Sequence, residues 1–249
     1  MNRIADIKLL VKGNRYILIK FVVLVSIVFS ILNLAIEKIG LNTLSVIVLI
    51  VFNYIISIYF AYILKYDLNR ISFTSFMDMM KKHSKGIILI AVIQFIIMLS
   101  WLIVLKLLSG IKYVVLFIQP LTLVFYVLLN YTNFKLIYNI FDCNKIDKKT
   151  FKKILSNIKD DKKIIFYLLL KTFTIIIIGC ICIYLIIIFV YAKQIDSAIN
   201  NVAVVNEALI NSYFSSTLSN FIQSFGAQII SGLVLIWIGN ASLFLENKR

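Results

Sequence analysis

The residues that could do chemistry are few in this chain of 249 residues, and their spacing assembles no catalytic or metal-binding motif. The single histidine, His83, stands beside Lys82 with no second metal ligand at a suitable spacing, which favours a solvated loop position. The sequence contains neither an H-E-x-x-H motif nor a glycine-rich phosphate loop. None of the eleven acidic residues falls in the middle of a long apolar stretch, where an ion-coupled carrier usually holds a carboxylate. We therefore predict no catalytic residue, cofactor or metal site, and a protein that is not an enzyme.

Uncharged polar and small residues inside the apolar stretches are the next candidates. At 100° per residue, the stripe that begins at Gln228 and ends at Ser242 falls on one helix face, and Asn53 and Ser57 lie one turn apart. Such stripes are typical of close helix packing in lipid, and the alternative is a polar path for a solute. Pro120 predicts a kink or a hinge in its helix. The candidates for helix packing or a polar path are Asn53, Ser57, Gln94, Gln119, Pro120, Gln228, Gly232 and Gly239.

The elements that carry these residues are predicted to cross a membrane. Of all residues, 61% are apolar and only 15% are charged, and the mean hydropathy is +0.98, which leaves too little polar surface for a water-soluble protein. Because lipid offers no partners to backbone groups, long apolar stretches are predicted to be helices even where isoleucine and valine dominate. We expect a single all-α integral membrane domain over residues 1–249, a bundle with six spans at about 16–36, 43–64, 87–105, 113–137, 164–191 and 225–245.

The distribution of basic residues predicts the orientation. Nineteen Lys and Arg lie in the N-terminal arm, the loops 65–86 and 138–163 and the C-terminal tail, against four in the alternate segments. By the positive-inside rule, both termini and both basic loops lie in the cytoplasm of a bacterial-type plasma membrane. Three further lysines, Lys20, Lys135 and Lys171, lie just inside helix ends, where their stems are expected to snorkel to the headgroups. The net charge of +15 is thus mainly a topology signal, and no soluble basic domain indicates nucleic-acid binding.

Three connecting segments show helical periodicity. In the loop 138–163 an apolar face alternates with lysines, which predicts a helix on the anionic inner leaflet or a docking site for a cytosolic ATPase or membrane partner, formed by Phe151, Lys152, Lys153, Ile154 and Ile158. In the loop 65–86, Ser75 and Asp78 have the spacing of a capping box at the start of a short helix. The outer segment 192–224 is predicted to form one or two amphipathic helices, as a passive cap or as a lid.

The segment from Leu99 to Lys112, with Trp101 followed by Gly110, Ile111 and Lys112, resembles part of an uncharacterised bacterial family of six-helix integral membrane proteins, a domain of unknown function. The resemblance covers about residues 60–190 and implies a six-helix membrane fold but no reaction. Two functional hypotheses follow. The first is a non-enzymatic polytopic membrane protein, an envelope, stress or immunity component that acts by interaction. The alternative is the permease subunit of an ATP-driven, ABC-type exporter whose ATPase is a separate chain.

Overall fold

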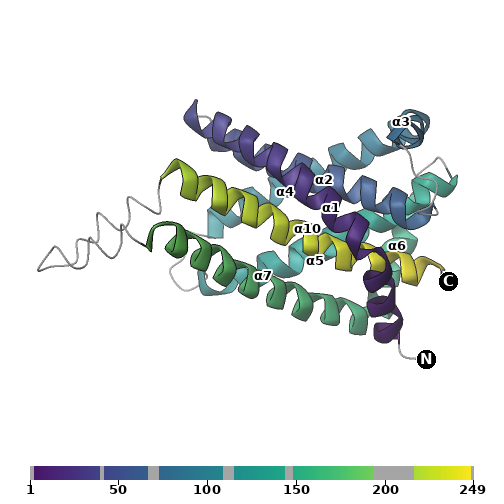
Figure 1. Cartoon of the computed structure of the whole chain (residues 1–249). Coiled ribbons are helices and arrows are strands. Elements are labelled where there is room, and N and C mark those ends of the chain that lie inside the picture. Colours follow the sequence, from purple (N-terminus) through teal and green to yellow (C-terminus); the bar gives the residue numbers. More distant parts are fainter. Residues whose placement is uncertain are drawn as a thin grey trace, which may run out of the picture. The chain divides into compact units, whose positions relative to one another are not determined.

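α-Helices make up all the regular structure of the described residues in the computed structural model (Figure 1). The structure describes residues 3–39, 42–66, 73–108, 115–143, 148–192 and 216–247. The all-helical prediction is therefore confirmed for this part of the chain. The helices are α1 (Arg3–Lys38), α2 (Asn42–Lys65), α3 (Phe73–Lys82), α4 (Ser84–Leu108), α5 (Val115–Cys143), α6 (Lys148–Asp160), α7 (Lys162–Val190) and α10 (Thr217–Asn247).

Four helical segments are long and apolar enough to cross a membrane: Arg15–Ile36, Ser84–Leu108, Lys162–Val190 and Thr217–Leu245. They coincide with four of the predicted spans, so the structure is compatible with a membrane protein. The other two predicted spans lie in α2 and α5, which are also helical. Within α2 the apolar stretch Ile50–Lys65 is shorter, and α5 carries several polar residues in its second half. The number of six spans and their orientation stay predictions.

The chain divides into two compact units. Unit 1 comprises residues 1–18, 53–173 and 234–249, and unit 2 comprises residues 19–52 and 174–233.

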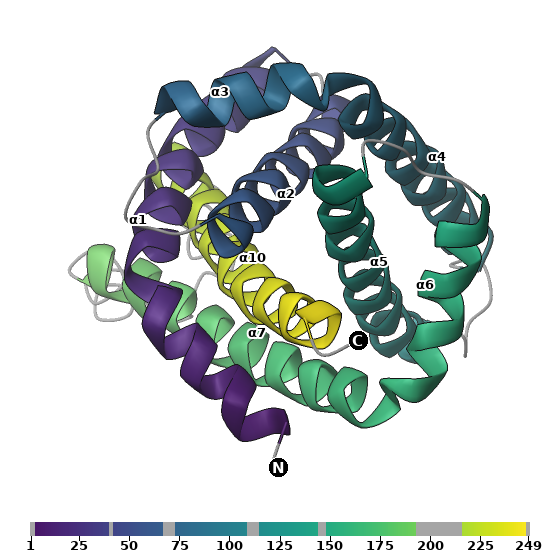
Figure 2. The ribbon, with the colours of Figure 1, turned by 90° about the vertical axis from the view of Figure 1, so that its right-hand side faces the viewer.

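In unit 1, α5 lies in the core. Val127, Tyr131, Phe134 and Ile137 are spaced by three or four residues on α5 and are fully buried. α5 packs against α4 and α6, and α3 packs against α4. The hydroxyl of Tyr54 on α2 donates to the backbone carbonyl of Ile87 on α4. Figure 2 shows the end of unit 1 at which α3 and α6 lie around the ends of α2, α5 and α10. Short and long helices of this unit are thus joined by side-chain contacts.

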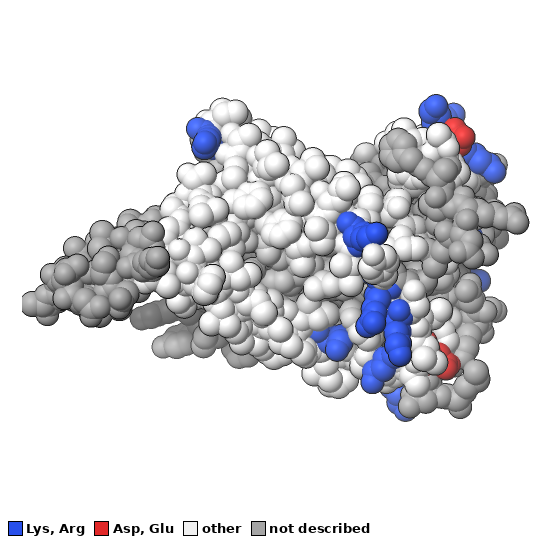
Figure 3. Space-filling model, viewed as in Figure 1, with Lys and Arg blue, Asp and Glu red and all other residues white. Residues whose placement is uncertain are grey.

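The first helix begins earlier than the predicted span at residue 16. α1 begins at Arg3 because the N-terminal arm is itself amphipathic. Ile7, Val11 and Leu18 recur at helical spacing and are buried, whereas Lys8, Lys12 and Arg15 are exposed. Figure 3 shows basic side chains gathered over this part of α1 and over α3. The arm that the sequence marked only as charged therefore forms part of unit 1.

Both basic loops contain the predicted short helices, α3 and α6. The predicted capping box in the first of them is wrong, because α3 begins at Phe73 and Ser75 lies inside the helix rather than before it. The Ser75 hydroxyl accepts a hydrogen bond from the Tyr62 hydroxyl at 2.9 Å, and Phe76 lies edge-on against Tyr59 and Tyr62. Ser75 is therefore in tertiary contact with α2.

Unit 2 contains parts of α1, α2, α7 and α10, and α7 and α10 approach each other closely. A Cβ added at Gly179 would lie 2.4 Å from Ile230, and one added at Gly226 would lie 2.4 Å from Ile183. Each glycine thus receives an isoleucine of the other helix. An apolar cleft of about 530 Å³ follows this contact. Of the outer segment 192–224, residues 193–215 lie outside the described part, and α10 begins at Thr217, ahead of the predicted span.

Candidate functional site

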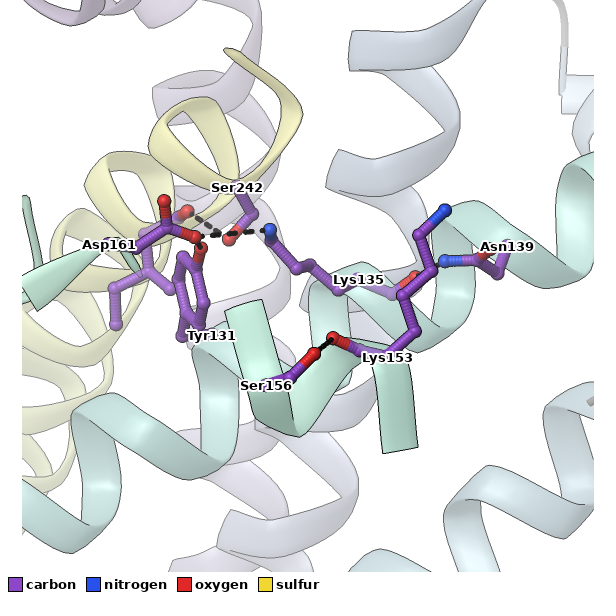
Figure 4. Close-up of polar contacts among 8 residues, drawn as sticks. Tyr131, Lys135, Asn139, Lys153, Ser156, Asp161 and Ser242 are labelled. Atoms are coloured by element: carbon purple, nitrogen blue, oxygen red, sulfur yellow. Dashed lines mark hydrogen bonds and ion pairs between the residues drawn. The ribbon is translucent and has the colours of Figure 1, made fainter. Parts of the chain in front are cut away.

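A buried ion pair in unit 1 joins α5 to the junction between α6 and α7. The Lys135 ammonium lies 3.5 Å from Oδ2 of Asp161, and both side chains are 0% exposed. The Tyr131 hydroxyl donates a hydrogen bond of 2.6 Å to the same carboxylate oxygen. Tyr131 and Lys135 are four residues apart on α5 and so point the same way, as Figure 4 shows. One carboxylate oxygen therefore receives a charged partner and a neutral donor from a single helix.

The backbone fixes the position of Asp161 between two helices. Its amide donates to the carbonyl of Asn157 at 3.1 Å, and its own carbonyl accepts from the amides of Ile164 and Ile165 at 2.9 and 3.0 Å. Asp161 directly precedes α7, so its carboxylate lies near a helix N-terminus, where the helix dipole favours negative charge. The aspartate is thus stabilised by its own helix junction as well as by α5.

The cluster is suited to holding helices together. The Lys135 ammonium lies 5.0 Å from the centroid of the Tyr131 ring, a cation–π distance. Removing one member of a buried pair leaves an uncompensated charge, which costs about 3–5 kcal/mol. Because both charged side chains are fully enclosed, the arrangement fixes α6 and the start of α7 on α5.

This cluster was not among the sites predicted from the sequence. Lys135 was predicted to snorkel to the headgroups, and that prediction is wrong, because its side chain is fully buried and paired with Asp161. The signal available was a lysine and a tyrosine one turn apart inside an apolar stretch, together with an aspartate directly before another one. His83 was likewise predicted to be solvated, but it is buried with its ring 5.7 Å from the ring of Phe141.

One of the predicted packing or polar-path residues, Asn53, links α2 to α5, and a second, Ser57, is bonded to it within α2. The Tyr126 hydroxyl donates to Oδ1 of Asn53 at 3.3 Å, and the Ser57 hydroxyl donates to the Asn53 carbonyl at 2.8 Å. Asn53 and Ser57 are both buried. The amide of Asn53 is therefore part of a helix–helix contact within unit 1.

The next three predicted residues have different surroundings. Gln94 is buried on α4 and lines a small cavity against α5. Gln119 and Pro120 lie near the start of α5 and are exposed. Gln94 and Asn53 thus lie in separate environments, Gln94 facing α5 across a cavity and Asn53 bonded to Tyr126.

The predicted stripe on α10 is divided between the two units. In unit 2, Gln228 accepts a hydrogen bond of 3.3 Å from the Ser30 hydroxyl, and a Cβ at Gly232 would lie 2.4 Å from Val22. In unit 1, a Cβ at Gly239 would lie 2.9 Å from the ring of Phe134, and the carbonyl of Gly239 accepts from the Tyr138 hydroxyl at 3.1 Å. Burial raises the pKa of Tyr138, just beyond the predicted fourth span, well above its ordinary value, so the phenol remains a donor.

The docking residues predicted on α6 differ in their exposure. Lys152 and Lys153 are exposed, Ile154 is buried and Ile158 is half-buried. The side chain of Phe151 lies outside what the structure describes. The apolar side of α6 is thus at least partly occupied by the protein itself, while two lysines face outward.

Among the described residues, no group of three His, Cys, Asp or Glu side chains lies close enough together to hold a metal ion. Comparison with known proteins finds no match to a family model, to a curated protein or to a solved structure.

Proposed function

We propose that this chain is a multi-pass membrane protein that acts by interaction rather than by catalysis, and that it offers a basic end to an anionic partner. One observation carries the proposal. In unit 1 the exposed acidic side chains of the described residues are Asp78 and Asp160, whereas the exposed basic ones are Lys8, Lys12, Arg15, Lys81, Lys82, Lys85, Lys152, Lys153, Lys162 and Lys163, together with Lys106 near the C-terminal end of α4. α3, α6, the N-terminal end of α1 and the C-terminal end of α10 lie at the same end of this unit (Figures 1 and 2).

The basic side chains stand on helices that are held in place. α6 is attached through buried Ile154 and through the adjacent Lys135–Asp161 pair, so Lys152 and Lys153 are displayed on a fixed element. Each lysine near an anionic leaflet contributes about 1 kcal/mol of attraction. This supports an envelope, stress or immunity component in a bacterial-type plasma membrane, with both termini in the cytoplasm, where the inner leaflet or an acidic partner meets this surface.

A second candidate function is the permease subunit of an ATP-driven exporter. The observation in its favour is the presence of two short helices, α3 and α6, fixed against longer helices and carrying exposed lysines. Two such helices at a cytoplasmic end would give a separate ATPase two docking points. The resemblance to a six-helix family of unknown function adds no reaction to either candidate.

The orientation is tested by labelling single cysteines in intact cells. In a background with Cys143, Cys180 and Cys182 replaced by alanine, Lys153→Cys is expected to stay unlabelled by an impermeant thiol reagent until the membrane is permeabilised. Lys38→Cys, on the opposite predicted side, is the matched control and is expected to react without permeabilisation. Labelling of Lys153→Cys in intact cells would refute the cytoplasmic basic end and with it the proposal.

The two candidate functions are separated by purification of the full chain in mild detergent. An interaction protein is expected to purify without ATP hydrolysis, and neither it nor its Lys152→Glu/Lys153→Glu variant stimulates an ATPase. A co-purifying ATPase whose hydrolysis rises with the chain would overturn the first candidate in favour of the permease, provided that the double variant loses the effect and Lys38→Glu keeps it.

A further inference from the structure

Between α4 and α5, at the depth of two predicted spans, unit 1 contains a cavity of about 40 Å³. Most of its lining is aliphatic, supplied by isoleucines of α4 and leucines of α5. Three polar side chains interrupt this lining: Gln94 from α4, and Thr132 and Asn133 from α5. Polar groups are costly in such surroundings, so their presence here needs a physical reason.

The two amides of this cavity are buried and have unused hydrogen-bonding atoms. Gln94 is 6% exposed and Asn133 is 3% exposed. Within the described part of the chain, Oε1 of Gln94 and both Oδ1 and Nδ2 of Asn133 have no hydrogen-bond partner. Thr132, by contrast, donates its hydroxyl to the carbonyl of Leu128 at 2.8 Å. The cavity is thus lined by two acceptor oxygens and one NH₂ donor that the protein leaves unused.

Contacts on both sides of the cavity keep the two helices apart at this point. Toward one end, the rings of Trp101 and Phe125 stack with centroids 4.4 Å apart. Toward the other end, Gly86 receives Ile140 so closely that a Cβ would lie 2.9 Å from it. Because the helices are already in contact on either side, the cavity cannot close by a simple approach of α4 to α5.

We propose that this cavity is a binding site for water, held between Gln94 and Asn133 inside the predicted membrane-spanning part of the bundle. One water needs roughly 10–15 Å³ of such volume, so a cavity of about 40 Å³ accommodates up to about three. Water donates to Oε1 of Gln94 and Oδ1 of Asn133 and accepts from Nδ2 of Asn133, which matches the unused atoms. A dry cavity would be expected to have a wholly apolar lining.

The site is independent of the basic surface that carries the proposed function. Failure of the docking proposal would leave the cavity and its amides unchanged, and a dry cavity would leave the basic end unchanged. The proposed water hydrates this part of the α4–α5 interface, so that a hydrogen-bonded network replaces direct side-chain packing there.

The direct test is magnetisation transfer from water to side-chain amides, measured by NMR on the full chain in lipid nanodiscs. The Asn133 resonance is assigned by its loss in Asn133→Leu. We expect transfer from water to the Asn133 NH₂ group, reduced in Gln94→Met because the opposite anchor of the water is removed. Absence of transfer to Asn133, or a direct Gln94–Asn133 hydrogen bond in its place, would overturn the proposal.

Thermal unfolding of variants in the same nanodiscs gives a second measurement. Gln94→Met and Asn133→Leu replace each amide with an apolar side chain of similar length, and each is expected to lower Tm by roughly 2–8 °C because the opposite amide loses a bridged partner. The double variant is expected to recover at least half of that loss, since no unpaired amide remains. The matched control is Gln119→Leu, which changes an exposed amide on α5, the helix that carries Asn133. It is expected to leave Tm unchanged. Additive losses in the double variant would contradict a shared site.

Discussion

The second half of α5 in unit 1 and the second half of α7 in unit 2 are both helical segments of predicted spans, yet they use their side chains in opposite ways. From Val127 to Phe141 most of α5 is buried, and the buried residues include Asn130, Asn133 and Lys135. From Thr174 to Val190, α7 is almost wholly apolar and mostly exposed. The more polar segment is therefore the more buried one.

This difference matches the expectation for helices in lipid. Lipid tails are as apolar as leucine, so exposing the isoleucines of α7 costs nothing that burial would recover. Amides and ammonium groups, in contrast, gain partners only from other helices, and this favours placing them inside. Between these two segments, burial thus follows polarity rather than hydrophobicity.

Among the variants that test this comparison, the largest loss of stability is expected when the buried charge of α5 is removed. Lys135→Met is expected to destabilise the protein by about 3–5 kcal/mol, because Asp161 would keep a buried and unpaired carboxylate. The measurement is the apparent stability of the full chain in detergent. Adding Asp161→Leu should restore much of the loss, since no charge is then left unpaired. The matched control is Lys152→Met on the exposed side of α6, which should leave stability within about 0.5 kcal/mol. Equal effects of the two lysine variants would contradict the role of the ion pair.

A pair of phenylalanines gives the next largest contrast. Phe134 of α5 is 0% exposed, and Phe189 of α7 is 84% exposed. Phe134→Ala is expected to cost about 3 kcal/mol, the lower part of the range for soluble cores, because lipid removes the transfer contribution and leaves the lost packing. Phe189→Ala is expected to change stability by less than about 0.5 kcal/mol. The measurement is thermal unfolding of both variants in the same lipid. Equal losses of stability in the two variants would contradict the expected difference.

Two glycine variants are expected to change stability by smaller amounts and in opposite directions. Gly239→Ala places a Cβ 2.9 Å from the buried ring of Phe134 and is expected to destabilise by about 1–3 kcal/mol through overpacking. Gly13 lies inside α1 with nothing within 4 Å of its added Cβ, so Gly13→Ala is expected to stabilise by up to about 1 kcal/mol through helix propensity. Denaturation midpoints of both variants measure the two signs. A stabilising Gly239→Ala would show that α5 and α10 approach less closely than the structure places them.

The helices could be predicted from the sequence because helix formation depends on the local spacing of apolar residues. The apolar stretches predicted helices at all six positions, and the spacing of Ile154 and Ile158 predicted α6 before any contact was known. The start of α1 at Arg3 was missed although its signal was present, since Ile7, Val11 and Leu18 already follow a helical period.

The candidate site was less predictable because it depends on which polar groups meet. Snorkelling is the usual behaviour of a lysine near a span end, and nothing in the neighbourhood of Lys135 indicated Asp161, 26 residues away, as its partner. Likewise, the amide of Asn133 was not singled out, because its neighbours Asn130, Thr132 and Lys135 are also polar and the sequence does not show which helix each of them will face.

The sequence by itself determined an all-helical, strongly apolar chain with its basic residues concentrated in alternate segments, because composition and periodicity act locally. The tertiary structure alone decided that Lys135 is enclosed with Asp161 and Tyr131, and that Gln94 and Asn133 share a cavity. The physical reason is that a hydrogen bond or an ion pair requires two groups within about 3–4 Å, and only the packing of distant helices sets that distance.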